Sequence, residues 1–349
     1  MSLHDELQQS LFTVLEGRVE VSLVASLQHE GIGFPEELNI FLPDIHLITE
    51  ARQPSFGYGT NYSELLTDLV LKLKLFKTGA AGPKVIVYQL GDLLDLWRQT
   101  PDLDPGEDVA ACIANDRQEL MGALLDFGLE TQFLLGNHDF NLYRYPNFAA
   151  WERRAYLKDS TGASTAIALH GDMFDWMQGA LSILPDVAKS LFAYLFAPLW
   201  PAEESQLGEI VHLNKKARAA MNLKQYIQAP EPVPLGSTMP ADTRVPARFN
   251  VQTEADHLPD GMKYAVAAKN LCRQANQKYG TRLKTAVIGH THHARIAVID
   301  NGAEDFFALV DCGAWIEKYR TPESAQALPN AQIAAIGGNE ARIYQLQPR

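Results

Sequence analysis

The sequence predicts an α/β protein whose N-terminal half contains a largely parallel sheet. Short apolar segments at residues 38–42, 85–90 and 132–135 have the length and composition of β-strands. Two longer segments with helical periodicity lie between them. This alternation is typical of parallel strands, because the chain needs a long crossover, usually a helix, to return from the end of one strand to the start of the next. A polar motif follows each strand at once, and α/β proteins place their sites at such strand ends.

The two intervening segments predict helices. The first has apolar residues three and four positions apart, which places them on one helical face. These residues are Leu65, Leu66, Leu69, Val70, Leu73 and Phe76. A second helix is expected over residues 107–127, which are amphipathic at the same spacing.

The chain changes character after His170. Helical patterns and a proline-rich connector follow, at residues 177–197, 206–225, 230–246 and 264–279. The motifs on either side of this segment must meet in space if they belong to one site. We therefore expect residues 173–280 to form a helical cap, inserted between two parts of the core.

The C-terminal part predicts further strands. A strand at residues 285–288 precedes four alternating segments, at residues 296–299, 306–310, 332–336 and 342–346. Asn301-Gly302 and Gly337-Gly338 are turn signals between them. We expect the four segments to complete a second, mostly antiparallel sheet.

These expectations divide the chain of 349 residues into three parts. Residues 1–37 form an N-terminal extension, residues 38–172 and 281–349 form the core, and residues 173–280 form the cap. A chain of this length can bury a large core.

The composition excludes several classes of protein. The formal net charge of −12 argues against broad binding to nucleic acid, which requires a strong basic field. Three widely separated cysteines indicate neither a disulfide framework nor a cysteine-rich zinc site, and favour a reducing compartment. The N-terminus lacks the basic start and apolar run of a signal peptide, so we expect a cytoplasmic protein.

The most apolar stretch, residues 181–200, does not predict a transmembrane helix. Pro185, Asp186, Lys189 and Pro198 interrupt it, so it lacks the roughly 20 clean apolar residues that a spanning helix needs. This segment can still lie on a membrane surface, where it would give a peripheral contact. The sequence does not predict an oligomeric state.

Five short motifs carry side chains that bind metals. They are Pro43-Asp44-Ile45-His46, Gly91-Asp92-Leu93-Leu94-Asp95, Gly136-Asn137-His138-Asp139, His170-Gly171-Asp172 and Gly289-His290-Thr291-His292. Side chains two apart on an extended segment point the same way, so Asp44 and His46 can bind one ion together. Such a mixture of carboxylates and imidazoles suits Mn, Fe or Zn better than Ca or Mg.

Each motif alone has a simpler explanation. An Asp-x-His pair is usually a loop cap, a Gly-Asp-x-x-Asp run is commonly a turn with a helix N-cap, and a histidine ending an apolar strand is often a core residue. However, six of the ten histidines fall in or beside the motifs. Independent explanations would have to hold for all five motifs at once.

The ordered set resembles the calcineurin-like metallophosphoesterases over roughly residues 38–172 and 281–315. The resemblance implies a four-layer α/β/β/α sandwich of two mixed sheets with two divalent metal ions at the strand ends. One ion would be held by Asp44, His46, Asp92 and His292, and the other by Asp92, Asn137, His170 and His290.

The expected reaction is hydrolysis of a phosphoester or pyrophosphate bond. Two neighbouring cations can share a water and lower its pKa, so that hydroxide attacks the phosphorus. His138, oriented by Asp139, would protonate the leaving group. Asp95, Asp172 and Asp311 are placed to orient ligand histidines, although Asp95 also suits a helix cap.

A narrower resemblance is to the UDP-2,3-diacylglucosamine hydrolase branch, in the runs Gly91-Asp92-Leu93-Leu94-Asp95-Leu96-Trp97, His170-Gly171-Asp172 and Cys312-Gly313-Ala314-Trp315. Members of that branch often have arginine where this chain has His138 and His293. The resemblance implies a nucleotide-linked lipid as substrate, with the cap as an apolar wall. Lys215, Lys216 and Arg218 can meet its diphosphate, or they can form a solvated helix face.

Other functions remain open at this point. The same superfamily contains phosphodiesterases with nuclease activity and phosphoprotein phosphatases, although the net acidity disfavours a nuclease. A non-catalytic scaffold would have lost ligand residues, and this chain retains all of them.

Overall fold

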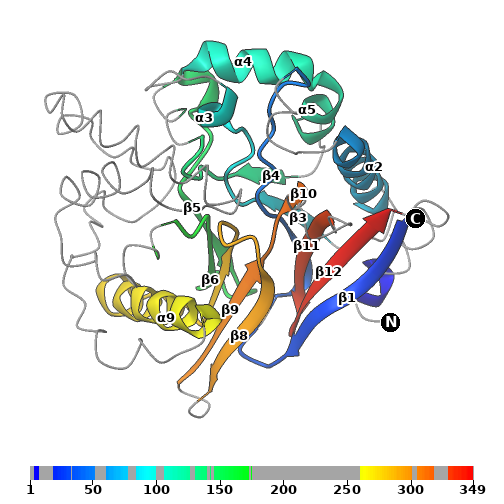
Figure 1. The fold of residues 1–349 in the computed structure, drawn as a ribbon. Coiled ribbons are helices and arrows are strands. Elements are labelled where there is room, and N and C mark those ends of the chain that lie inside the picture. Colours follow the sequence, from blue (N-terminus) through cyan, green and yellow to red (C-terminus); the bar gives the residue numbers. More distant parts are fainter. Residues whose placement is uncertain are drawn as a thin grey trace, which may run out of the picture.

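The computed structural model describes residues 4–7, 19–32, 34–51, 60–77, 84–99, 106–125, 130–139, 142, 145–172, 174, 260–300, 305–317 and 329–348. These residues form an α/β fold with two mixed β-sheets and helices packed against them (Figure 1). The predicted fold class is therefore confirmed at the level of an α/β protein with two mixed sheets.

The first sheet has seven strands. They are β1 (Val19–Gln28), β2 (Phe34–Leu42), β3 (Lys84–Gln89), β4 (Glu130–Phe133), β10 (Trp315–Glu317), β11 (Pro329–Gly338) and β12 (Glu340–Pro348). Their order is β1-β12-β11-β2-β3-β4, and β10 pairs with β11 outside this path. The neighbours β2, β3 and β4 are parallel, as their alternation with helices predicts.

The second sheet has five strands, in the order β5-β6-β7-β9-β8. They are β5 (Arg154–Lys158), β6 (Ser164–Leu169), β7 (Thr285–Ile288), β8 (Ala294–Asp300) and β9 (Phe306–Cys312). The inner strands β6, β7 and β9 run parallel, and the outer strands β5 and β8 pair with them in the antiparallel sense.

The prediction that the last four strands complete one antiparallel sheet is wrong. Strands β8 and β9 join the second sheet, whereas β11 and β12 join the first. Strand β11 pairs with β2 on one side and with β12 on the other, so it lies inside the first sheet. It is buried on both faces, because Ile333 and Ala335 pack in one hydrophobic cluster and Ala334 and Ile336 in another. Strand β9 is buried on both faces within the second sheet, so the apolar pattern does not specify which sheet a strand joins.

Part of the expected N-terminal extension belongs to the first sheet. Strand β1 pairs with β12 along residues 19–28, and β2 begins at Phe34. Both faces of β1 supply apolar contacts. Val21 packs in the cluster on one face, and after an irregularity of the pairing between Leu23 and Ala25, Ala25 and Leu27 pack against the cluster on the other. Residues 1–37 therefore contribute the edge strand at this side of the sheet.

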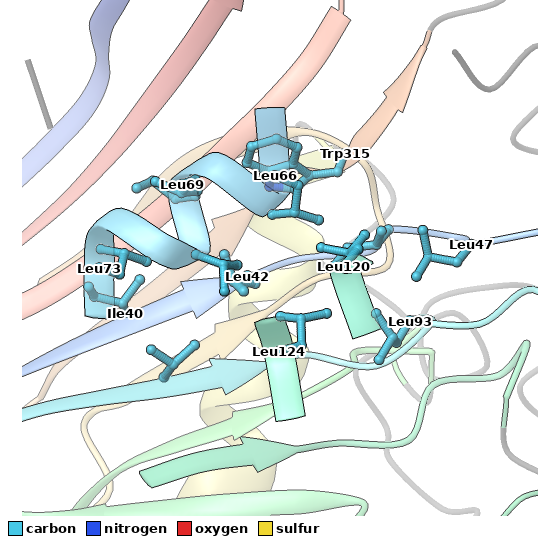
Figure 2. Close-up of a cluster of buried hydrophobic side chains, with 14 of the residues drawn as sticks. Ile40, Leu42, Leu47, Leu66, Leu69, Leu73, Leu93, Leu120, Leu124 and Trp315 are labelled. Carbon is cyan, nitrogen blue, oxygen red and sulfur yellow. The ribbon is translucent and has the colours of Figure 1, made fainter. Parts of the chain in front are cut away.

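Helices α2 (Thr60–Lys77), α4 (Glu107–Asp116) and α5 (Gln118–Leu125) pack on one face of the first sheet. Figure 2 shows Leu66, Leu69 and Leu73 of α2 gathered with side chains of β2 and α5. The apolar spacing of α2 predicts this face, since residues three and four apart lie together on a helix. A short helix, α3 (Leu96–Gln99), follows the second motif.

The single helix predicted over residues 107–127 is divided at Arg117. The backbone there leaves the helical region, with φ −110° and ψ 34°. The Arg117 side chain is buried, and its Nε–H donates to the carbonyl oxygen of Ile48 at 3.0 Å. Its Nη1–H donates to Glu50 at 3.1 Å. A tertiary contact with the loop after the first motif therefore accompanies the break between α4 and α5.

Helix α9 (Asp260–Tyr279) packs on the second sheet, opposite the side that faces the first (Figure 1). Its Ala265, Ala268 and Cys272 are buried against β6, β7 and β9. This helix falls within the expected cap, yet its apolar face covers sheet residues. The remaining cap from residue 175 onward, including residues 181–200, lies outside the described residues. Among the helices of the described part, none combines the length and apolarity needed to cross a membrane.

Substitution of Leu69 by alanine is expected to destabilise the fold strongly. Leu69 is fully buried in the cluster of Figure 2, and removal of such a side chain costs about 2–5 kcal/mol of unfolding free energy. Leu71→Ala on the same helix is the matched control, because Leu71 is 42% exposed. Its cost is expected to stay below about 1 kcal/mol. Urea unfolding of both variants checks the difference, and equal costs would contradict the packing of α2.

Candidate metal centre

The predicted ligands converge where parallel strands of both sheets end. Asp44 and His46 follow β2, Asp92 follows β3, and Asn137 comes shortly after β4. In the second sheet, His170 follows β6, and His290 and His292 follow β7. The isolated bridge between Asp44 and Ala314 and the hydrogen bond from Trp315 N–H to Asp44 O, at 2.7 Å, connect the end of β2 to the segment that follows β9. Six separate segments thus meet at one edge.

The backbone at four of the predicted ligands adopts an uncommon conformation. Among the described residues, the non-glycine positions with positive φ are His46, Asp92, His290 and His292, at 52°, 51°, 67° and 58°. This region costs about 1–3 kcal/mol for each such residue and persists where neighbouring contacts enforce it. One such contact is the N–H of His46, which donates to Asp92 O at 2.8 Å. All four strained residues are predicted ligands.

Two of the motif glycines have a steric role. A methyl group at Gly136 would overlap Asp92 Oδ1, and one at Gly289 would overlap Asp44 Oδ1. The absence of a side chain lets the neighbouring backbone N–H groups reach these carboxylates. His138 N–H donates to Asp92 Oδ1 at 2.8 Å, and His290 N–H lies 2.9 Å from both oxygens of Asp44.

The first set of donor atoms comes from Asp44, His46 and His292. Asp44 Oδ2 lies 3.0 Å from His292 Nε2, and the Nε2 atoms of the two histidines are 3.2 Å apart. The same His46 nitrogen is 3.8 Å from Asp92 Oδ2. Imidazole nitrogens that face each other beside a carboxylate can share one cation.

The second set surrounds His170. Its Nδ1 lies 3.0 Å from the carbonyl oxygen of Leu90, and a carbonyl can only accept, so Nδ1 carries a proton. The opposite nitrogen, Nε2, faces Asn137 Oδ1 at 2.7 Å, His290 Nδ1 at 3.2 Å and Asp92 Oδ2 at 3.3 Å. Lone pairs that converge in this way require a proton or a cation between them.

The pKa shifts at this place show that the carboxylates and the imidazoles stabilise one another's charged forms. Burial alone would lower the pKa of His170, but the carboxylates of Asp92 and Asp44 outweigh it and raise the pKa to about 9. Burial would raise the pKa of Asp44, yet His170 and His292 outweigh that effect and hold it below its ordinary value. The pKa of Asp92 is lowered in the same way, with His170 and His138 opposing burial. Both carboxylates therefore stay ionised despite their burial, and ionised carboxylates can hold a cation.

The expectation that Asp139 orients His138 is not met. His138 Nδ1 lies 2.8 Å from Asp95 Oδ1, whereas Asp139 accepts hydrogen bonds from the backbone N–H groups of Leu93 and Gly136, at 2.9 and 2.8 Å. Burial, reinforced by Asp92, raises the pKa of Asp139 to about 7. Asp139 therefore joins the second and third motifs, and Asp95 is the partner of the His138 ring.

Asp95 contacts two histidines from the start of α3. Its Oδ2 lies 3.3 Å from His46 Nδ1, in addition to the contact of Oδ1 with His138. Burial would raise its pKa, but His138 and His46 outweigh it and lower the pKa below the ordinary value. The Asp95 side chain thus contacts the rings of His46 and His138. Asp95 stands directly before α3, where a helix cap would stand, but its carboxylate faces these two histidines.

Within the part of the chain that the structure describes, three groups of side chains have donor atoms close enough to hold a metal ion. They are Asp44 with His46 and His292, Asp44 with Asp92 and His170, and His46 with Asp95 and His138, each with all donor atoms within 4.8 Å of one another. Buried carboxylates and imidazoles in this arrangement fit metal binding, since a cation offsets charges that burial makes costly.

No protein-family model matches this chain. A search of curated proteins finds no match either. The chemistry of the site therefore carries the functional conclusion.

Solvent access differs among the motifs. Asp44, Asp92, His138 and His170 are buried, with at most 2% of each residue exposed. Two other side chains of the motifs are more open, because His292 is 13% exposed and Asp172 is 17% exposed. Among the described residues of the five motifs, these two mark sides from which a ligand can approach.

Some site predictions cannot be placed, and one contact was missed. Lys215, Lys216 and Arg218 lie outside the described residues. Sequence reasoning did not single out Arg153, whose Nη2 lies 3.4 Å from Asp172 Oδ2. Arg153 stands one position before Arg154, which pairs with Leu169 beside His170. The sequence around Arg153 contains no pattern that predicts this contact, because the contact depends on the register in which β5 pairs with β6.

Proposed function

We propose that this protein is a metal-dependent hydrolase of phosphoester or pyrophosphate bonds, similar to the calcineurin-like metallophosphoesterases. The observation that carries the proposal is the convergence of donor atoms around Asp92 Oδ2. This oxygen lies 3.3 Å from His170 Nε2 and 3.8 Å from His46 Nε2. One carboxylate therefore faces both sets of donor atoms.

This position of Asp92 supports a pair of divalent cations, with Mn²⁺ preferred and Fe or Zn as alternatives. Asp44, His46 and His292 would hold one ion, and Asn137, His170 and His290 the other. Asp92 would contact both. When bound, two neighbouring divalent cations lower the pKa of a shared water and offset the negative charge of a phosphoryl group.

His138 is the proposed proton donor to the leaving oxygen. Its ring is held at Nδ1 by Asp95, and its Nε2 lies 3.9 Å from Asp92 Oδ2, on the side of the ligands. A carboxylate at Nδ1 stabilises the imidazolium form, which can release the Nε2 proton. Asp95 therefore takes the orienting role that the sequence suggested for Asp139.

The packing supports the four-layer α/β/β/α arrangement that belongs to this proposal. One hydrophobic cluster contains residues of α2, α4, α5 and the first sheet. A second contains residues of the two sheets, and a third contains α9 and the second sheet. The helical cap would be the part of residues 173–280 that precedes α9.

The proposed substrate is a nucleotide-linked lipid such as UDP-2,3-diacylglucosamine, cleaved in the cytoplasm or at a membrane surface. The motif Cys312-Gly313-Ala314-Trp315 supports it through the narrower resemblance. A guanidinium group suits phosphate oxygens, and Arg153 offers one beside Asp172.

The metal-loaded protein is expected to release p-nitrophenol from p-nitrophenyl phosphate or bis(p-nitrophenyl) phosphate. Removal of metal with a chelator should abolish the reaction, and Mn²⁺ should restore it, because the metal supplies the nucleophile at neutral pH. A protein at full metal occupancy that cleaves neither substrate with Mn, Fe or Zn would favour a non-catalytic scaffold.

A second assay addresses the substrate. The Mn-loaded protein is incubated with UDP-2,3-diacylglucosamine, nucleoside diphosphates, cyclic nucleotides and phosphopeptides, and the released phosphate species are separated. Turnover of another class without turnover of the UDP lipid would overturn the substrate assignment and leave the hydrolase class intact.

A further inference from the structure

The fifth motif lies between two buried carboxylates. On one side, Asp44 accepts the N–H of His290 at 2.9 Å. On the other, Asp311 Oδ2 accepts the hydroxyl of Thr291 at 2.6 Å. Both aspartates are fully buried, so the accepting side of each contact is shielded from bulk water.

Thr291 connects the middle of the motif to this second carboxylate. Its hydroxyl donates to Asp311 and also accepts the N–H of His293 at 3.1 Å. The residues on either side, His290 and His292, have φ values of 67° and 58°. A hydroxyl bonded in both directions limits the conformations available to the backbone on either side of it.

Asp311 is itself held in place from the second sheet. It stands opposite Arg295 in the pairing of β8 with β9, and Arg295 Nε lies 3.0 Å from its Oδ2. The Arg295 guanidinium also lies over the ring of Tyr264 in α9, 5.8 Å from the ring centroid. Among the described residues, no hydrogen-bond donor reaches the buried Oδ1 of Asp311.

We propose that Asp311 and Thr291 are positioning residues for the metal centre. They hold the fifth motif so that the rings of His290 and His292 face the other ligands. This inference rests on the proposed function, because it assigns those two histidines to the metals. Asp311 contributes no donor atom to the ligand sets, and its effect on the site passes through Thr291.

The test compares three threonine variants. Thr291→Val removes the hydroxyl and keeps the shape of the side chain, whereas Thr291→Ser keeps the hydroxyl. Thr161→Val is the matched control, since Thr161 donates to Asp159 Oδ1 at the same 2.6 Å in an exposed turn between β5 and β6. The dissociation constant for Mn²⁺ is measured by titration of each full-length protein, together with its melting temperature.

Thr291→Val is expected to raise the Mn²⁺ dissociation constant at least about tenfold, the loss typical of groups that orient metal ligands. Thr291→Ser is expected to stay close to the wild type, and Thr161→Val to leave the affinity unchanged. A role in folding alone would lower the melting temperature of Thr291→Val while sparing the Mn²⁺ affinity, and that result would overturn the inference.

The outcomes separate this inference from the proposed function. Wild-type affinity in Thr291→Val overturns the positioning role and leaves the metal centre intact. A wild-type protein that takes up no metal overturns both. If the wild type binds Mn²⁺ but hydrolyses no phosphoester, the proposed reaction fails, and the comparison of affinities still decides the positioning role.

Discussion

Asp92→Asn is expected to abolish metal binding and phosphoesterase activity together. The substitution keeps an oxygen that can accept the N–H of His138, which Asp92 Oδ1 accepts at 2.8 Å, so the third motif stays in place. It also puts an NH₂ group near the position of Oδ2, which faces His170 and His46. The site then loses a negative charge and gains donors where a cation needs an acceptor.

Metal content and activity check this result. Elemental analysis of the purified variant is expected to show less than one ion per chain. Turnover is expected to fall at least about 10³-fold, beyond the 10–100-fold loss typical of groups that only orient ligands. Asp108→Asn is the control, because Asp108 is exposed in α4 and distant in sequence from the motifs. Full occupancy in Asp92→Asn would show that Asp92 does not bridge the ions.

His138→Ala is expected to retain the metals and lose most of the activity. The backbone N–H that Asp92 accepts survives the substitution, so the ligand carboxylate keeps its partner. Loss of a positioned proton donor typically slows turnover about 10²–10⁴-fold. The variant therefore separates proton transfer from metal binding.

Two measurements on the same preparation decide the role of His138. Metal stoichiometry should equal that of the wild type, while kcat falls. Asp95→Asn should lower kcat less, because an amide oxygen can still accept from His138 Nδ1. If His138→Ala loses metal in proportion to activity, the group of His46, Asp95 and His138 binds an ion and the proton-donor role is wrong.

The convergence of the proposed ligands could be predicted because the signals are local. Asp44, Asp92 and His170 each stand one or two residues after a short apolar segment, and the carboxyl ends of parallel strands meet at one edge. The parallel pairing of β2, β3 and β4 could be predicted as well, because the alternation of strands and helices is also a local pattern.

Pairings between distant segments could not be predicted. Asp95 follows a strand and precedes a helix, as an N-cap does, and its contact with His138 depends on how two loops pack 43 residues apart. The position of Asp139 directly after His138 suggested a pairing that the backbone direction does not allow, since Asp139 points to Leu93 and Gly136. Adjacency in sequence did not give adjacency of side chains.

The assignment of strands to sheets was also beyond local patterns. Alternating apolar residues show that β8, β9, β11 and β12 are strands, but periodicity carries no information about the partner. Strands β9 and β11 are both buried on both faces, yet they join different sheets. The helix break at Arg117 is a similar case. The residues around it have helical periodicity, and the contact with Ile48 that accompanies the break is between residues distant in sequence.

The order of strands in the first sheet constrains how a growing chain can fold. Strands β2, β3 and β4 can pair in this order early in synthesis, but β12 must be made before β1 has a neighbour in this sheet. His290 reaches Asp44 across 246 positions of sequence, so the centre assembles late. Until then one edge of β2 stays open, and such edges recruit other chains. We therefore expect the yield of folded protein to depend on expression conditions that slow aggregation, and not only on the free energy of unfolding of the finished fold.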